Sequence, residues 1–316
     1  MKKAFTLLEM TFVIVILGII AGISSEVIAK TYEAYINQRA LYRSSIKTEL
    51  AITQITNRLA YAIPGSVVAR DTSDDSLSDI SSIDSNNTFD TLQWIGYDRD
   101  SFIARSGPGD LATNRRPGWT GFCDLTASGR VAGPTSNIGI STPGSNLNLA
   151  NTIIGNLSTG GTACSLASAA VYFPVDALNI HNNADAYTVA GNPGIFNTND
   201  DGTDDENLSI AAPNTNISIK EQYKLAWTSY AIVATDEDGN GGTDLVLRYN
   251  FQPWRGAAGG FYNDAATTAG QKVLIRDISV FRFTGTENVV RLKICKPERI
   301  SADESISVCK EKAVIR

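Results

Sequence analysis

The chain begins MKKAFTLLEMTFVIVILGIIAGISSEVIAK (residues 1–30), and the pattern of charged and apolar residues here predicts a long N-terminal helix. Lys2 and Lys3 precede a predominantly apolar run of 19 residues, from Phe5 to Ile23, which contains one charged residue, Glu9. As a helix this run would measure about 28 Å, the thickness of a membrane's hydrocarbon core. Because basic residues favour the cytoplasmic side of a membrane segment, we expect the N-terminus in the cytoplasm and everything after Ile23 outside.

Two ordinary explanations of such a segment are a removed signal peptide and an uncleaved signal anchor. The run is long for a signal peptide, and no A-x-A cleavage site follows it. Glu9 is unusual in a plain anchor, because an ionisable group in the membrane costs a few kcal/mol and needs a partner. Cleavage between Ala4 and Phe5 would create an α-amino group four residues before Glu9. A neighbouring copy could present that amine to the carboxylate.

The stretch KAFTLLEMTFVIVILGIIA (residues 3–21) resembles the prepilin leader and N-terminal helix of type IV pilins and type II secretion pseudopilins. The resemblance implies that a prepilin peptidase removes residues 1–4 and that Phe5 becomes N-methylated. It also implies that Glu9 acts in filament assembly. The family usually has Gly directly before the cut, where this chain has Ala4.

The same resemblance implies partners and a location. The expected partners are other pilin or pseudopilin subunits, the prepilin peptidase, an inner-membrane assembly platform and membrane lipid. The protein would cross the bacterial inner membrane once, with its head in the periplasm, and then enter a periplasmic or surface filament.

The helical pattern continues beyond the membrane segment. Residues 24–63 contain no Pro or Gly, and their apolar residues recur at spacings of three and four, which predicts an amphipathic helix that Pro64-Gly65 ends. The sequence therefore predicts one helix over 5–63, about 88 Å long, with a transmembrane part (5–23) and an amphipathic part (24–63). We expect the second part to pack on a globular head formed by residues 64–316.

The head is expected to be rich in β-strands, which gives an α+β, pilin-like fold. Surface loops are predicted at 71–88 and 127–163, which are rich in Ser, Asn, Asp or Gly. Six segments are predicted as strands: Phe89–Tyr97, Trp119–Leu125, Trp227–Thr235, Asp244–Phe251, Lys272–Phe283 and Val289–Cys295. The last four are expected to form two antiparallel hairpins. The final pair loosely resembles the C-terminal sheet of large minor, J-type pseudopilins, and a length of 316 residues suits a minor subunit at a filament tip.

Four cysteines allow three pairings, and all four lie in the part of the chain expected outside the cytoplasm, where disulfides persist. Pairing in sequence order would join Cys123 to Cys164 and Cys295 to Cys309, while free buried thiols are the alternative. The family resemblance adds weight to Cys295–Cys309, because many type IV pilins close a C-terminal loop in this way.

Two acidic segments have the ligand spacing of a calcium loop, with oxygen-bearing side chains at positions 1, 3, 5 and 9 and Gly at position 6. The first supplies Asp236, Asp238, Asn240 and Asp244, with the carbonyl of Gly242 at position 7. The second supplies Asn197, Asn199, Asp201 and Asp205. Two Asn in the second segment predict weaker binding. Ordinary solvated turns are the alternative in both cases.

The composition and motifs of the chain argue against two classes of function, nucleic-acid binding and catalysis. A net charge of −6, from 27 basic and 33 acidic residues, disfavours nucleic-acid binding. The sequence contains no G-x-x-x-x-G-K-[ST] motif, and no G-x-S-x-G motif lies near the single histidine, His181. We therefore expect a structural subunit rather than an enzyme.

One alternative is a membrane-anchored tip adhesin or DNA-uptake module, because seven Lys and Arg residues in the last 26 positions could form a basic edge. Another is an enzyme or receptor on an uncleaved anchor. The sequence leaves open whether the protein serves secretion, a pilus or competence.

Overall fold

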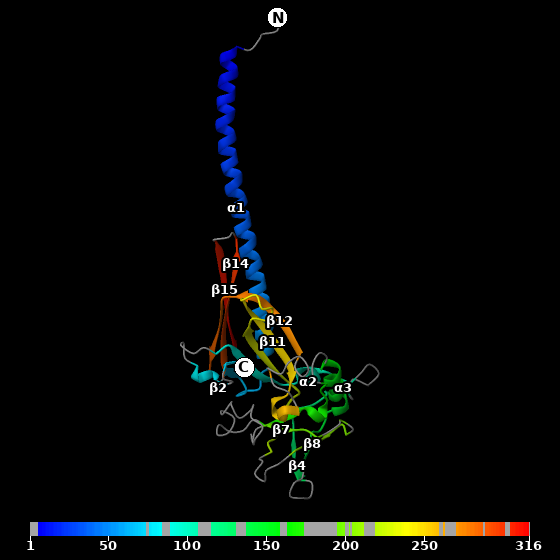
Figure 1. The fold of residues 1–316 in the computed structure, drawn as a ribbon. Helices are drawn as coiled ribbons and strands as arrows, with labels where there is room; N and C mark the ends of the chain where they lie inside the picture. The colour runs from blue at the N-terminus through cyan, green and yellow to red at the C-terminus, as the bar shows by residue number, and fades with distance from the viewer. Residues whose placement is uncertain are drawn as a thin grey trace.

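The structure is a computed structural model that describes residues 6–73, 76–83, 89–106, 115–130, 137–158, 163–173, 195–199, 202, 204–211, 219–258, 262, 270–286, 288–300 and 304–315. A single long helix projects away from a head built of antiparallel sheets (Figure 1). The expected combination of a long apolar N-terminal helix with antiparallel β-structure is confirmed.

Helix α1 spans Leu7–Leu59 and its 53 residues measure about 80 Å. The helix ends four residues before the predicted end at Ile63. The chain leaves it there because residues 61–63 bind strand β3 (Thr91–Gly96) instead. The Ile63 N–H donates to the Ile95 carbonyl at 2.8 Å, and the Tyr97 N–H donates to the Tyr61 carbonyl at 3.0 Å.

The largest sheet has six strands in the order β12-β11-β10-β3-β1-β2, and every pairing in it is antiparallel. Its remaining members are β1 (Val68–Arg70), β2 (Leu77–Asp79), β10 (Thr228–Thr235), β11 (Thr243–Phe251) and β12 (Gly270–Ile278). The predicted hairpin Trp227–Thr235/Asp244–Phe251 is confirmed as β10–β11.

The C-terminal sheet contains β13 (Val280–Gly285), β14 (Val289–Arg299) and β15 (Ser305–Ile315). The predicted strand Lys272–Phe283 is therefore wrong as one element. The chain breaks at Ser279, so that β12 extends the large sheet and only β13 pairs with β14. Strand β15 had no counterpart in the prediction.

Two further three-stranded sheets lie in the part of the head farthest from the start of α1 (Figure 1). They contain β4 (Asp124–Arg130), β5 (Ile138–Ser141) and β8 (Asn207–Ile210), and β6 (Ala170–Tyr172), β7 (Ile195–Asn197) and β9 (Lys224–Ala226). The described residues also form helices α2 (Arg99–Ile103) and α3 (Leu147–Leu157) and the 3-10 helices Ile80–Ser82, Leu166–Ser168 and Pro253–Ala258.

The expected surface loop 127–163 is wrong where it contains the end of β4, strand β5 and helix α3. Helix α3 buries Leu147, Ala150 and Ile154 on one face, and Asn146 caps it by accepting the Leu149 N–H at 2.9 Å. Its Asn-rich sequence obscured the helical spacing of these three residues. The loop predicted at 71–88 likewise contains the short strand β2 and a 3-10 turn.

The head has two main hydrophobic cores. The first lies between the second half of α1, the six-stranded sheet and the C-terminal sheet, and includes Ile52, Ile55 and Trp94. The second lies around α3 and the two smaller sheets, and includes Trp119 and Phe173. The first core fixes α1 to the head, so the direction in which α1 projects is set by the packing of its second half.

Candidate functional site

The start of α1 holds Glu9 in a defined position. Thr6 and Glu9 form a capping box, in which each side chain binds the other residue's backbone N–H. The Thr6 N–H and hydroxyl each lie 3.0 Å from Glu9 Oε2, and the Glu9 N–H lies 3.4 Å from Thr6 Oγ1. The carboxylate is therefore turned back toward the N-terminal side of the helix. The cleavage and methylation residues, Ala4 and Phe5, lie outside the described residues.

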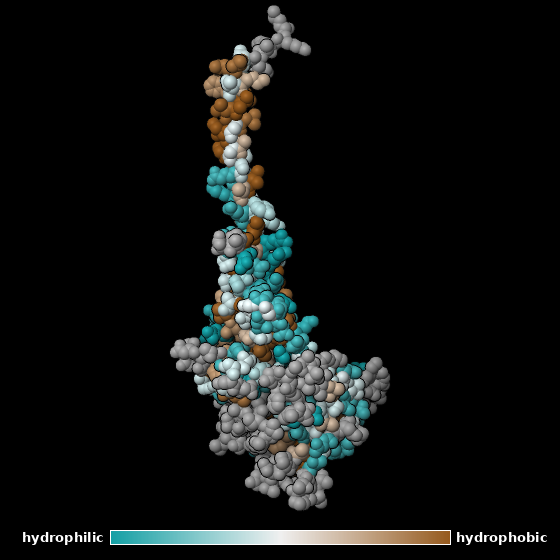
Figure 2. Space-filling view, in the orientation of Figure 1, coloured by the Kyte–Doolittle hydropathy of each residue, from teal (hydrophilic) through white to brown (hydrophobic). Residues whose placement is uncertain are grey.

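The first half of α1 exposes its apolar side chains on all sides. Figure 2 shows hydrophobic residues covering this part of the helix, with hydrophilic surface beginning lower down. The helix is long and apolar enough to cross a membrane, and none of its most apolar stretch is buried against the head. This segment is a candidate membrane anchor, on length and composition alone.

The second half of α1 has two opposite faces. One face packs on the head and buries Ala40, Ser44, Thr48, Ala51, Ile52, Ile55 and Leu59. The other face leaves large side chains exposed: Tyr32, Tyr35, Tyr42, Ile46 and Leu50. At about 100° per residue, Ile46 lies about 180° around the helix from Ile55. Large side chains are therefore exposed on the side of α1 that faces away from the head, together with the charged side chains of Arg39 and Arg43.

Polar contacts join α1 to the C-terminal sheet beside this packed face. Glu49 lies 2.5 Å from Lys312 Nζ and 3.9 Å from Lys310 Nζ, and Lys312 also donates to Thr53 Oγ1 at 2.9 Å. The hydrogen bond from Lys312 lowers the pKa of Glu49 below its usual value. The Ser44 hydroxyl donates to the Lys296 carbonyl at 3.0 Å.

The basic residues near the C-terminus, which suggested one basic edge, lie on two different faces of the C-terminal sheet. Lys310 and Lys312 pair with Glu49, and Lys296 is 4% exposed. Arg291 and Lys293 lie exposed on the other face of the sheet.

The cysteines follow one of the two predicted pairings. Cys295 and Cys309 lie directly opposite each other in β14 and β15 and form a disulfide, as expected. The expected Cys123–Cys164 disulfide is not formed, since both residues are buried thiols of the second core. Cys123 Sγ contacts Ser128 Oγ at 3.3 Å instead. Burial raises the pKa of both thiols, that of Cys164 to about 11, which keeps them protonated and unreactive.

The first acidic loop is the turn between β10 and β11. Asp236 accepts the N–H groups of Asn240 and Gly241, at 3.2 and 2.9 Å, and Asn240 Oδ1 accepts the Gly242 N–H at 2.6 Å. Gly239 and Gly241 have φ of 71° and 82°, which the tight turn requires. The turn thus holds its predicted oxygen-bearing residues in one compact loop.

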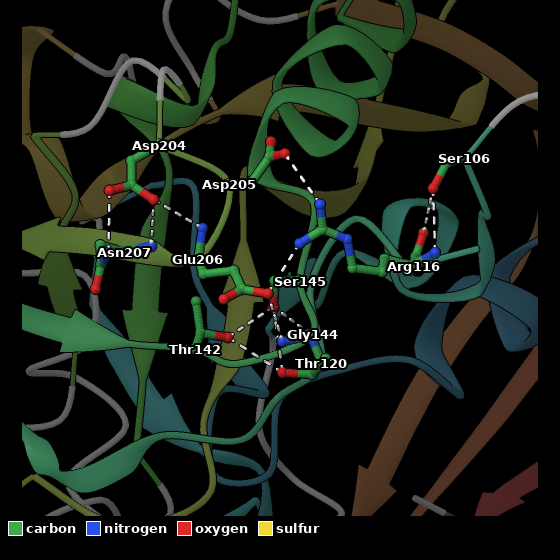
Figure 3. Close-up of polar contacts among 10 residues, drawn as sticks. All are labelled: Ser106, Arg116, Thr120, Thr142, Gly144, Ser145, Asp204, Asp205, Glu206 and Asn207. Atoms are coloured by element: carbon green, nitrogen blue, oxygen red, sulfur yellow. Dashed lines mark hydrogen bonds and ion pairs between the residues drawn. The ribbon is translucent and has the colours of Figure 1, made fainter. Parts of the chain in front are cut away.

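In the second acidic loop, several of the predicted calcium ligands contact other residues of the protein. Asp205 lies 3.4 Å from Arg116, which also contacts Glu206 at 2.8 Å (Figure 3). The Asn199 amide donates to Asn137 Oδ1 at 2.9 Å, and Asn197 belongs to β7. Asp201 and His181 lie outside the described residues.

Asp204 is not among the predicted calcium ligands, but it orders the same loop. Its carboxylate accepts the N–H groups of Glu206 and Asn207 at 3.0 and 3.2 Å. Figure 3 shows its carboxylate directed at Asn207, away from Arg116. A run of acidic residues followed by Asn was the only sequence signal for this role.

In the described part of the chain, no three His, Cys, Asp or Glu side chains already converge as a metal centre. No family profile, curated protein or solved structure matches the chain.

Proposed function

We propose that this protein is a structural subunit of a filament, a minor pilin or pseudopilin that is stored in a membrane by the first half of α1 and then assembled. The observation that carries the proposal is the division of α1 into two parts. The second half is fixed to the head by a hydrophobic core, whereas the first half projects with its apolar side chains exposed. A membrane can cover that surface before assembly, and helices of neighbouring subunits can cover it afterwards.

Glu9 gives the assembly a preferred register. A carboxylate transferred from water into a bundle of apolar helices costs several kcal/mol unless a cation meets it. The α-amine of a neighbouring chain cut after Ala4 would supply that cation. The capping box with Thr6 already directs the Glu9 carboxylate toward the N-terminal end of the helix, where such an amine would approach.

In this proposal the partners are other subunits of the same filament, a prepilin peptidase, an inner-membrane assembly platform and membrane lipid. The head would lie in the periplasm, where the Cys295–Cys309 disulfide would persist. The division of the basic residues between two faces of the C-terminal sheet supports a structural role over DNA binding.

The test replaces Glu9 with Ala in cells that assemble the filament. We expect Glu9→Ala protein to accumulate in the membrane at the normal level but to be lost from the sheared filament fraction. Glu26→Ala is the matched control, because Glu26 lies on the same helix beyond the apolar run and pairs with Lys30 at 2.7 Å. Normal incorporation of Glu9→Ala would refute the proposed role of Glu9.

A further inference from the structure

Strand β12 brings a further carboxylate, that of Asp277, to the turn between β10 and β11. Thr243 pairs with Ile278 and Leu245 pairs with Ile275, so strand β12 has a bulge opposite Asp244. Arg276 and Asp277 form that bulge, and Asp277 has φ of 53°, in the left-handed region. Bulges redirect side chains, and this one directs both residues toward the turn.

The oxygen atoms of Asp277 and Asn240 face each other across Gly242. A Cβ atom built on Gly242 would lie 2.6 Å from Asp277 Oδ1 and 2.8 Å from Asn240 Oδ1. A side chain at position 242 would therefore displace both groups. The glycine leaves a small space that is lined by oxygen atoms.

Asp244 contributes a buried carboxylate to the same place. Its side chain is 1% exposed, and its Oδ1 accepts the Asp277 N–H at 3.0 Å. Its Oδ2 accepts no hydrogen bond from any residue that the structure describes. A buried carboxylate oxygen without a hydrogen bond is costly, which points to a cation that would bind it.

Arg276 now supplies the positive charge beside this oxygen. Its Nη1 lies 3.7 Å from Asp244 Oδ2, beyond hydrogen-bond distance, and the same nitrogen contacts the carboxylate of Asp238. The Arg276 side chain is 52% exposed. It can therefore turn into solvent without disturbing the core, whereas Asp244 cannot move away.

We propose that the turn binds a calcium ion and that the ion displaces the guanidinium of Arg276. The oxygen ligands are the side chains of Asp236, Asp238, Asn240, Asp244 and Asp277 and the carbonyl of Gly242. Calcium takes six to eight oxygen ligands, which matches this set completed by water. A divalent ion compensates four carboxylates better than one guanidinium does, and it gives Asp244 Oδ2 a direct partner. Binding fixes the β10–β11 hairpin to the bulge of β12.

The experiment is a calorimetric titration of the full-length protein in detergent with calcium chloride. We expect saturable binding that Asp238→Asn weakens at least about tenfold, because calcium affinity follows the number of charged ligands. Arg276→Gln should instead tighten binding several-fold, because it removes the competing cation. Both residues are partly exposed, so the variants retain the fold, which tryptophan fluorescence checks.

Glu237→Gln is the matched control, because it removes one negative charge from the same turn. The Glu237 carboxylate contacts Arg248 and Gln271 rather than the proposed site, so its loss should leave the affinity unchanged. Absence of saturable binding, equal binding by Asp238→Asn, or weaker binding by Arg276→Gln would each overturn the proposal.

Discussion

At the scale of single residues, Asp98 shows how the fold holds an acid in an unfavourable place. It is 2% exposed and caps α2, where its Oδ1 accepts the Ser101 N–H at 3.1 Å. Burial raises its pKa from 3.8 to about 6, and the hydrogen bonds from Ser101 only partly oppose that rise. Because the folded protein binds this proton more tightly than the unfolded chain, stability falls as pH rises from about 4 to about 6.

The variant Asp98→Asn should remove this pH dependence. Asn still caps the helix but carries no charge, so at pH 7 the free energy of unfolding should rise by about 2–3 kcal/mol. At pH 4 the gain should vanish. Urea unfolding of the detergent-solubilised chain at both pH values measures this. Asp100→Asn, at an exposed neighbour, serves as the control, and an Asp98→Asn gain that is equal at both pH values would contradict the account.

At the scale of elements, the second half of α1 has opposite faces in different surroundings. The face that contains Ile55 is fully buried in the first core, while Ile46 on the other face is 40% exposed. The two residues have the same chemistry and the same helical environment. They differ only in what covers them, the head in one case and, by our proposal, another subunit in the other.

This difference gives a paired prediction. Ile55→Ala should lower the free energy of unfolding by about 2–5 kcal/mol, because it leaves a cavity in the core. Ile46→Ala should change it by less than about 0.5 kcal/mol, yet reduce recovery of the protein in filaments. Urea unfolding followed by tryptophan fluorescence measures the first effect, and shearing of filaments measures the second. Equal stability losses in the two variants would contradict the assignment of the faces.

The elements also show what sequence could predict. Helix α1 and the β10–β11 hairpin could be predicted, because the spacing of apolar residues and the presence of turn residues are local features of the sequence. The split of 272–283 at Ser279 could not be predicted, since no Gly or Pro marks the point where the chain passes from one sheet to the other. Helix α3 was hidden by its Asn content. Asp277 reaches the β10–β11 turn only through strand pairing and a bulge.

At the scale of the whole molecule, the two cores differ in whether a disulfide lies beside them. The C-terminal sheet beside α1 contains the Cys295–Cys309 disulfide, which closes a loop worth roughly 3 kcal/mol in a chain-entropy estimate. The second core contains the two thiols of Cys123 and Cys164, and packing is supplemented there by buried hydrogen bonds such as that between Tyr223 and Thr142 at 2.8 Å.

A count of reactive thiols tests whether the protein has one disulfide and two thiols. Alkylation of the unreduced protein in denaturant should add two groups, at Cys123 and Cys164. The native protein should react slowly at neutral pH, because both thiols are buried and have raised pKa values. No alkylation of the denatured chain would mean that a second disulfide exists after all.

The proposed function requires that the chain be cleaved before assembly, and the mass of the N-terminal peptide reveals whether it is. Protein taken from its native membrane is digested and the first peptide is measured by mass spectrometry. The account predicts a peptide that begins at Phe5 and carries one added methyl group. A peptide that begins at Met1 would contradict it and would indicate an uncleaved membrane anchor.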